Sequence, residues 1–64
     1  MAEDVFLTVE EVAKRLSVHE ETVRRWIRNG ELEAIDLQGP AGYRISQAEL
    51  NRFIRERATK RKDA

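Results

Sequence analysis

The chain has 64 residues, enough for one small domain, and its 12 basic and 12 acidic side chains give a formal net charge of zero. At this length folding buries only about 60 % of the surface that the unfolded chain exposes, so a large core is excluded. The sequence contains no cysteine, which excludes disulfides and thiolate chemistry, and no apolar run approaches the roughly 20 residues of a membrane span, so we expect a soluble intracellular protein.

The first predicted helix begins at a strong start signal near the amino end. Residues 1–7 are predicted to be an acidic, frayed lead-in in which only Phe6 and Leu7 can dock onto a core. Thr8 and Glu11 then have the spacing of a capping box, which marks the start of a helix. One apolar stripe follows at i, i+3, i+4 and i+7, on a helix of about eight residues. Its members are Val9, Val12, Ala13 and Leu16.

A sharp corner at residues 17–19 leads into a second predicted helix, with Ser17 or His19 available to cap it. This helix has an apolar face at i, i+3 and i+4, which predicts burial of Val23, Trp26 and Ile27. It is expected to end at Asn29-Gly30, because either residue can adopt the left-handed conformation that terminates helices. Its free face carries Arg24, Arg25 and Arg28. Basic groups on the free side of a short helix are typical of a helix that enters the major groove of DNA.

The segment after the second helix changes its periodicity from helical to alternating. Ile35 and Leu37 alternate with Asp36, as on a half-buried strand. Residues 38–42 contain the only proline and two of the three glycines, which predicts a hairpin loop with residues 43–45 as the return strand. Two strands alone are marginal, so this hairpin is expected to lean on the helices.

A third helix is predicted from a second capping box, formed by Ser46 and Glu49. Its apolar face is expected to pack through Leu50, Phe53 and Ile54. The order helix, tight turn, helix, hairpin, helix predicts a mainly α fold with a small β-hairpin, a winged helix-turn-helix. We therefore divide the chain into a lead-in (1–7), a winged helix-turn-helix domain (8–57) and a basic tail (58–64) that is expected to be disordered.

The zero net charge conceals an asymmetry between the two parts of the chain. Residues 1–21 hold six acidic and two basic side chains, a balance of −4, whereas residues 22–64 hold ten basic and six acidic ones, a balance of +4. A basic region within a neutral protein can still bind phosphates locally. The neutral total therefore does not exclude a nucleic acid as the partner.

Four segments of the chain carry a resemblance to a known family. They are residues 7–13 (LTVEEVA), residues 22–30 (TVRRWIRNG) with Leu32 and Ala34 following, residues 42–45 (GYRI), and Ser46 with Glu49, Leu50 and Phe53. Together they resemble the compact winged helix-turn-helix of the MerR superfamily, and most closely the small excisionase-type DNA-binding proteins. The resemblance spans residues 6–55. The chain departs from it at Ser17, where the family usually has glycine, and in the wing loop, which carries Pro40 and lacks a basic residue before the tyrosine.

The predicted DNA-binding residues lie on the second helix and the wing. On the helix we expect Arg24 and Arg25 to read bases first, then Thr22 and Glu21, with Arg28 on the backbone and His19 at the exposed amino end. The resemblance implies a phosphate contact from Arg44. For Tyr43 two roles stay open, a DNA contact from the wing or packing against the core. A structural alternative is that Glu20 and Glu21 complement the helix dipole and support Arg24 and Arg28 at i+4 on a solvated face.

Several function classes compete on the sequence alone. The single histidine and the lack of a glycine-rich phosphate loop predict no enzyme, no catalytic residue, no metal and no cofactor. Double-stranded DNA is the predicted partner, bound by a small transcriptional regulator; an excisionase-like architectural cofactor of a recombinase, or a protein-interaction module, are the alternatives. Because the chain ends at Ala64, before an effector domain could follow, we expect no small-molecule effector. We expect either a bare DNA-binding unit, with further copies side by side on repeated sites, or a fragment of a longer protein. The expected location is cytoplasmic and nucleoid-associated, in a bacterial or phage setting.

Overall fold

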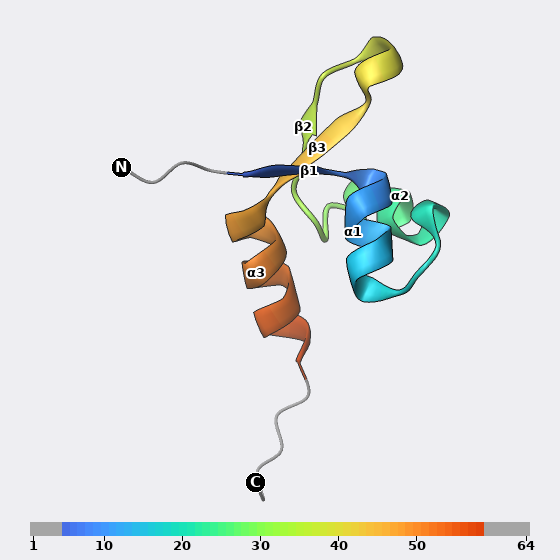
Figure 1. Cartoon of the computed structure of the whole chain (residues 1–64). Coiled ribbons are helices and arrows are strands. Elements are labelled where there is room, and N and C mark those ends of the chain that lie inside the picture. Colours follow the sequence, from blue (N-terminus) through green and yellow to red (C-terminus); the bar gives the residue numbers. More distant parts are fainter. Residues whose placement is uncertain (1–4, 59–64) are drawn as a thin grey trace, which may run out of the picture.

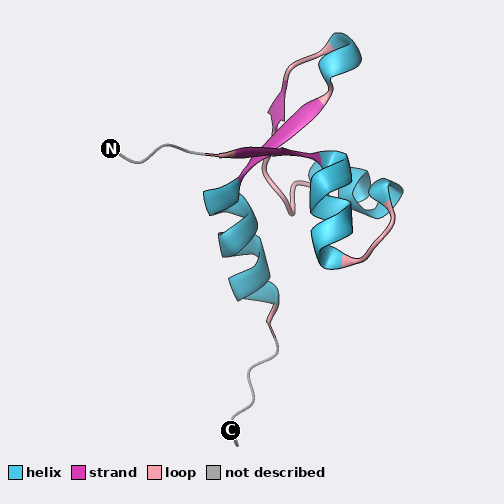
Figure 2. Ribbon diagram, in the orientation of Figure 1, coloured by secondary structure: helices cyan, strands magenta, loops and turns pink. Residues whose placement is uncertain are grey.

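A computed structural model describes residues 5–58, in which three helices combine with a three-stranded antiparallel sheet of order β1-β3-β2. Figure 1 shows the hairpin of residues 35–46, here called the wing, projecting away from the helices, with β1 crossing its base. Helices predominate, as Figure 2 shows, so the predicted winged helix-turn-helix is confirmed. The elements in chain order are β1 (Phe6–Thr8), α1 (Val9–Leu16), α2 (Glu20–Arg28), β2 (Ile35–Asp36), the short 3-10 turn η1 (Gly39–Ala41), β3 (Tyr43–Ser46) and α3 (Gln47–Arg57).

Strand β1 was not predicted from the sequence. It pairs antiparallel with β3, with Leu7 opposite Ile45, and both side chains are buried. The backbone N–H of Gln47 donates to the carbonyl of Val5 at 2.8 Å, which continues the pairing beyond the strand. The fold therefore includes residues that the sequence assigned to a lead-in. The rest of that lead-in, and the predicted tail apart from residue 58, lie outside the described residues.

Helix α1 and the corner after it follow the predicted signals. The Glu11 N–H donates to Thr8 Oγ1 at 3.0 Å and the Thr8 N–H donates to Glu11 Oε1 at 2.9 Å, so the capping box is confirmed. Helix α1 ends at Ser17, whose φ of 57° and ψ of 46° lie in the left-handed region. This is the position where the resembled family usually has glycine, and the chain adopts the turn with a serine instead.

Only half of the second predicted capping box is present. The Glu49 N–H donates to Ser46 Oγ at 3.0 Å, but the Glu49 carboxylate accepts from the backbone N–H of Glu33 at 2.9 Å and from Arg52 Nε at 2.8 Å. The prediction of a reciprocal box was wrong here, because a neighbouring segment offers the carboxylate a better-placed donor than its own N-cap. Glu49, with its side chain 11 % exposed, thus links α3 to the segment that enters the wing.

The core lies between the helices and one face of the sheet. Leu32, in the loop before β2, is 1 % exposed. Trp26 and Ile27 pack against the margin of the core, as their predicted burial requires, but are only partly buried. No helix within residues 5–58 is long and apolar enough to cross a membrane. The buried residues are Leu7, Val9, Val12, Ala13, Val23, Leu32, Ile45, Leu50 and Phe53.

Three predictions of burial were wrong. Ile35 and Leu37 are each 48 % exposed, and Ile54 is 42 % exposed. Ile35 pairs with Arg44, the neighbour of buried Ile45, so alternation places Ile35 on the face of the sheet that points away from the helices. On α3 only the stripe through Leu50 and Phe53 is buried, because the core is too narrow to cover a third apolar position.

Candidate nucleic-acid interface

Helix α2 is held by one face and presents the other outward. Val23 is fully buried. The backbone N–H groups of Glu31 and Leu32 donate to the Trp26 carbonyl at 2.9 and 3.2 Å, which ends the helix. Gly30 itself has a φ of +81°, as the predicted stop signal requires. A rotation of about 100° per residue then places the basic residues of the helix opposite Val23. The predicted residues Glu21, Arg25 and Arg28 are exposed, whereas Thr22 and Arg24 are half-buried.

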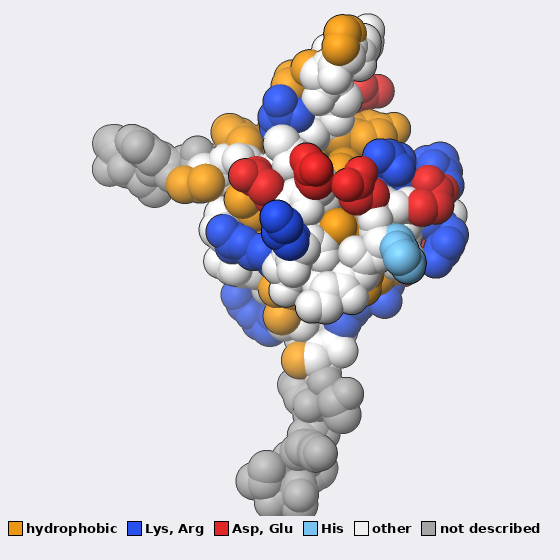
Figure 3. Space-filling view, turned by 45° about the vertical axis from the view of Figure 1, so that its right-hand side comes forward, with side chains coloured by type: hydrophobic (Ala, Val, Ile, Leu, Met, Phe, Trp, Pro, Cys, Tyr) orange, Lys and Arg blue, Asp and Glu red, His pale blue; other side chains and the backbone are white. Residues whose placement is uncertain are grey.

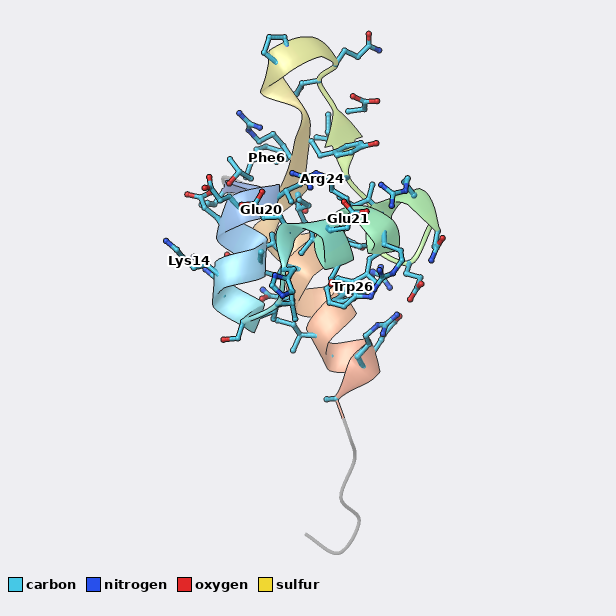
Figure 4. All side chains as sticks on the ribbon, turned by 90° about the vertical axis from the view of Figure 1, so that its right-hand side faces the viewer. Phe6, Lys14, Glu20, Glu21, Arg24 and Trp26 are labelled. Carbon is cyan, nitrogen blue, oxygen red and sulfur yellow. The ribbon has the colours of Figure 1, made fainter. Side chains whose placement is uncertain are left out.

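Two of the three arginines on α2 are paired with carboxylates of the same helix. Arg24 lies 3.2 Å from Glu20 and 3.5 Å from Glu21, and Arg28 lies 2.8 Å from Glu21. The hydrogen bond from Arg28, with its charge, lowers the pKa of the Glu21 carboxyl, and Arg24 adds a smaller effect in the same direction. The i+4 ion pair that the sequence offered as a structural alternative is therefore present between Glu20 and Arg24. Glu21 adds a second pair, with Arg28 two helical turns away. Figure 4 shows Arg24 beside Glu20 and Glu21.

Arg25 differs from its two neighbours. Its side chain is exposed, and within residues 5–58 it takes part in no ion pair. His19 is also exposed; it occupies the N-cap position of α2, but its side chain makes no capping hydrogen bond. Both side chains can therefore reach a ligand on the outer side of α2 without first giving up a partner in the described part of the chain.

A groove of about 450 Å³ separates α2 from the wing. Arg24 forms part of its wall on the helix side, and Tyr43 and Arg44 form part of it on the wing side. The Arg44 guanidinium donates to the carbonyls of Ala41 at 2.7 Å and Tyr43 at 3.0 Å, which anchors it to the wing loop through one of its nitrogens. A guanidinium has five N–H donors, so Arg44 retains donors for a phosphate oxygen. The groove therefore brings together two predicted DNA-binding arginines from segments twenty residues apart.

Tyr43 and Trp26 are both engaged in packing. Tyr43 is half-buried against the core, which is one of the two roles that the sequence left open. The Trp26 ring lies 4.8 Å from the Phe53 ring, and the Arg57 guanidinium covers both rings at 5.6 and 4.6 Å. Arg57 also pairs with Glu31. Sequence reasoning missed Arg57, because a cation 31 positions after Trp26 gives no local signal of this contact.

The surface around α2 is mixed in charge. The first turns of α1 and α2 are both acidic, and their last turns are basic. Figure 3 shows acidic side chains in a row below the wing, with basic side chains on either side of them. The arrangement differs from a uniformly basic patch, because carboxylates stand among the cations that would contact phosphates.

Comparison with known proteins gives one match. A protein-family model described as "Helix-turn-helix domain" matches residues 6–58, a span that includes every helix and strand from β1 to α3. No curated protein and no solved structure matches the chain significantly. The matched span contains all the predicted contact residues on α2 and the wing.

Proposed function

The chain belongs to the helix-turn-helix domain family, and on that basis we propose that it binds double-stranded DNA with α2 in the major groove and the wing against the adjacent backbone. The observation that carries this proposal is the groove whose lining includes Arg24 of α2 together with Tyr43 and Arg44 of the wing; α2 also carries the exposed Arg25. The helix-turn-helix family is a class of DNA-binding domains and is not a class of enzymes.

The roles of the side chains follow from their positions. Arg25 is exposed and without an ion-pair partner in residues 5–58, so it is the first candidate to pair with the O6 and N7 atoms of a guanine. Arg24 reads a base or closes on a phosphate at the groove beside the wing. The remaining contacts are a phosphate for Arg28 and Arg44, and a base edge for Glu21. Thr22, Tyr43 and His19 contact a base edge or a phosphate.

We propose that the biological role is that of a small transcriptional regulator that occupies repeated sites as adjacent copies. The alternative is an excisionase-like protein that bends DNA for a recombinase. The two roles differ in what selected binding sites would show. Strong bending of the repeated sites on binding would favour the architectural role, and occupation of the repeats with little bending would favour the regulator.

The first test is a titration of the protein into random-sequence duplex DNA from low to physiological salt. With about four to six phosphate contacts, log K is expected to fall against log salt with a slope of about −4 to −5. Absence of binding even at low salt would contradict the proposal and favour the protein-interaction module, whose apolar interface would depend little on salt.

Two substitutions then test the placement of α2. Arg24→Ala and Arg25→Ala are each expected to cost about 1–3 kcal/mol of specific binding without unfolding the domain. Arg55→Ala is the matched control, because Arg55 is an exposed arginine on α3. If both α2 variants keep the affinity of the control, α2 is not the recognition helix.

A further inference from the structure

An ion pair occupies the middle of the outward face of α2. Glu21 and Arg28 are seven residues apart, which is about two helical turns, so their side chains stack along one line of the helix surface. Arg24 lies on the wing side of that line and also contacts Glu21, at 3.5 Å. Glu21 has a side chain 60 % exposed and contacts both arginines. An anion in the first turn of α2 thus lies on the surface that is proposed to face the negatively charged DNA backbone.

The carboxylate of Glu21 competes with DNA phosphates for the same guanidinium groups. A phosphate that approaches Arg28 meets the negative charge of Glu21, which lies 2.8 Å from one guanidinium nitrogen and partly neutralises the arginine. Glu20 also pairs with Arg24 on α2, at 3.2 Å, whereas the Arg52–Glu56 pair lies on α3. Glu21 therefore lowers the net attraction between α2 and any DNA backbone, whatever its sequence.

The same carboxylate makes a favourable contact where a base presents a hydrogen-bond donor to it. In the major groove a carboxylate accepts a hydrogen bond from the exocyclic amino group of cytosine, and the amino group of adenine is a donor of the same kind. Guanine and thymine present only acceptors at the corresponding positions, so they repel it. Discrimination by a penalty on the wrong partner is a general route to specificity.

We propose that Glu21 is a specificity-determining residue: it holds Arg28 on non-specific DNA and releases it where a cytosine or adenine amino group takes its carboxylate. Arg24 is shared with Glu20 and therefore stays paired when Glu21 turns to a base. This inference rests on the proposed function, since it requires α2 to face DNA. It predicts that one side chain weakens non-specific binding, and that one position in the binding site requires cytosine or adenine on the strand that faces Glu21.

The test compares Glu21→Gln with the matched control Glu56→Gln. Both variants lose one negative charge from an exposed glutamate that pairs with an arginine, but Glu56 lies on α3. Relative to the control, Glu21→Gln is expected to bind random-sequence duplex about three- to tenfold more tightly at low salt. Its salt slope is expected to steepen by about 1, because Arg28 loses its carboxylate partner while Arg24 keeps Glu20. Thermal unfolding followed by circular dichroism checks that both variants remain folded.

Site selection from a random duplex library completes the test. The wild-type protein is expected to select cytosine or adenine at one position that Glu21→Gln no longer discriminates. The double variant Glu21→Gln/Arg28→Gln is expected to lose most of the gain in random-sequence affinity, because the released cation is then absent. A Glu21→Gln protein that binds random DNA no better than the Glu56→Gln control, or a gain that persists fully without Arg28, would overturn the inference while leaving the proposed function intact. A wild-type protein without salt-dependent DNA binding would overturn the proposed function itself.

Discussion

Replacing Glu49 by alanine is expected to destabilise the domain by about 1–2.5 kcal/mol, which is the sum of three contributions. The hydrogen bond from the Glu33 N–H, at 2.9 Å, is charge-assisted, and because Glu33 is exposed we assign it about 0.5–1 kcal/mol. A carboxylate in the first turn of α3 adds about 0.3–1 kcal/mol. The pair with the exposed Arg52 adds about 0.3–0.5 kcal/mol.

The assay is urea denaturation at pH 7, followed by the fluorescence of Trp26, the only tryptophan. Glu56→Ala is the control, because Glu56 also pairs with Arg52, at 2.7 Å, but lies near the other end of α3. The control is expected to lose no more than about 0.5 kcal/mol. If Glu49→Ala loses no more than Glu56→Ala, the contact between α3 and the segment before the wing does not stabilise the fold.

The destabilisation is also expected to depend on pH. The hydrogen bond from Arg52, and less strongly that from the Glu33 N–H, lower the pKa of Glu49 below its ordinary value of 4.5, against the opposing effect of burial. Because the folded state favours the ionised form, the contribution of Glu49 is fully present above pH 4.5 and is lost as the pH falls through its lowered pKa. The stability difference between wild type and Glu49→Ala should therefore shrink at pH 3. A difference that stays constant from pH 7 to pH 3 would contradict this origin.

Three further substitutions test other parts of the fold by thermal or urea unfolding. Trp26→Ala should cost about 3 kcal/mol, the low end of the range for buried aromatics because Trp26 is only partly buried; a folded variant of unchanged stability would refute its packing against Phe53. Ser17→Gly should stabilise the domain by about 0.5–1 kcal/mol, since Ser17 has a φ of 57°, and a lower midpoint would count against that turn geometry. Gln38→Gly should stabilise it by about 1 kcal/mol, since Gln38 adopts φ 60° and ψ 160°, a region that glycine occupies almost alone; unchanged stability would speak against a strained wing loop.

The local sequence determined the helices and the corner between α1 and α2. Thr8 with Glu11, the apolar spacing around Val23 and the stop at Gly30 each act within one or two turns of helix, so their effect can be predicted without knowledge of the fold. The predicted loop at residues 38–42 and the return strand also follow from local signals, and the structure contains both. The candidate arginines on α2 could be named for the same reason.

Only the tertiary structure decided how those elements meet. The pairing of Leu7 with Ile45, the hydrogen bond from Glu33 to Glu49, and the cover of Arg57 over Trp26 join residues 16 to 38 positions apart. It also decided that Ile35 lies on the exposed face of the sheet and that Arg24 reaches the groove beside the wing. The physical reason is that a periodic pattern indicates which side of a helix or strand is apolar, but not what that side packs against. The packing partner depends on how distant segments compete for a small core and for the same hydrogen-bond donors.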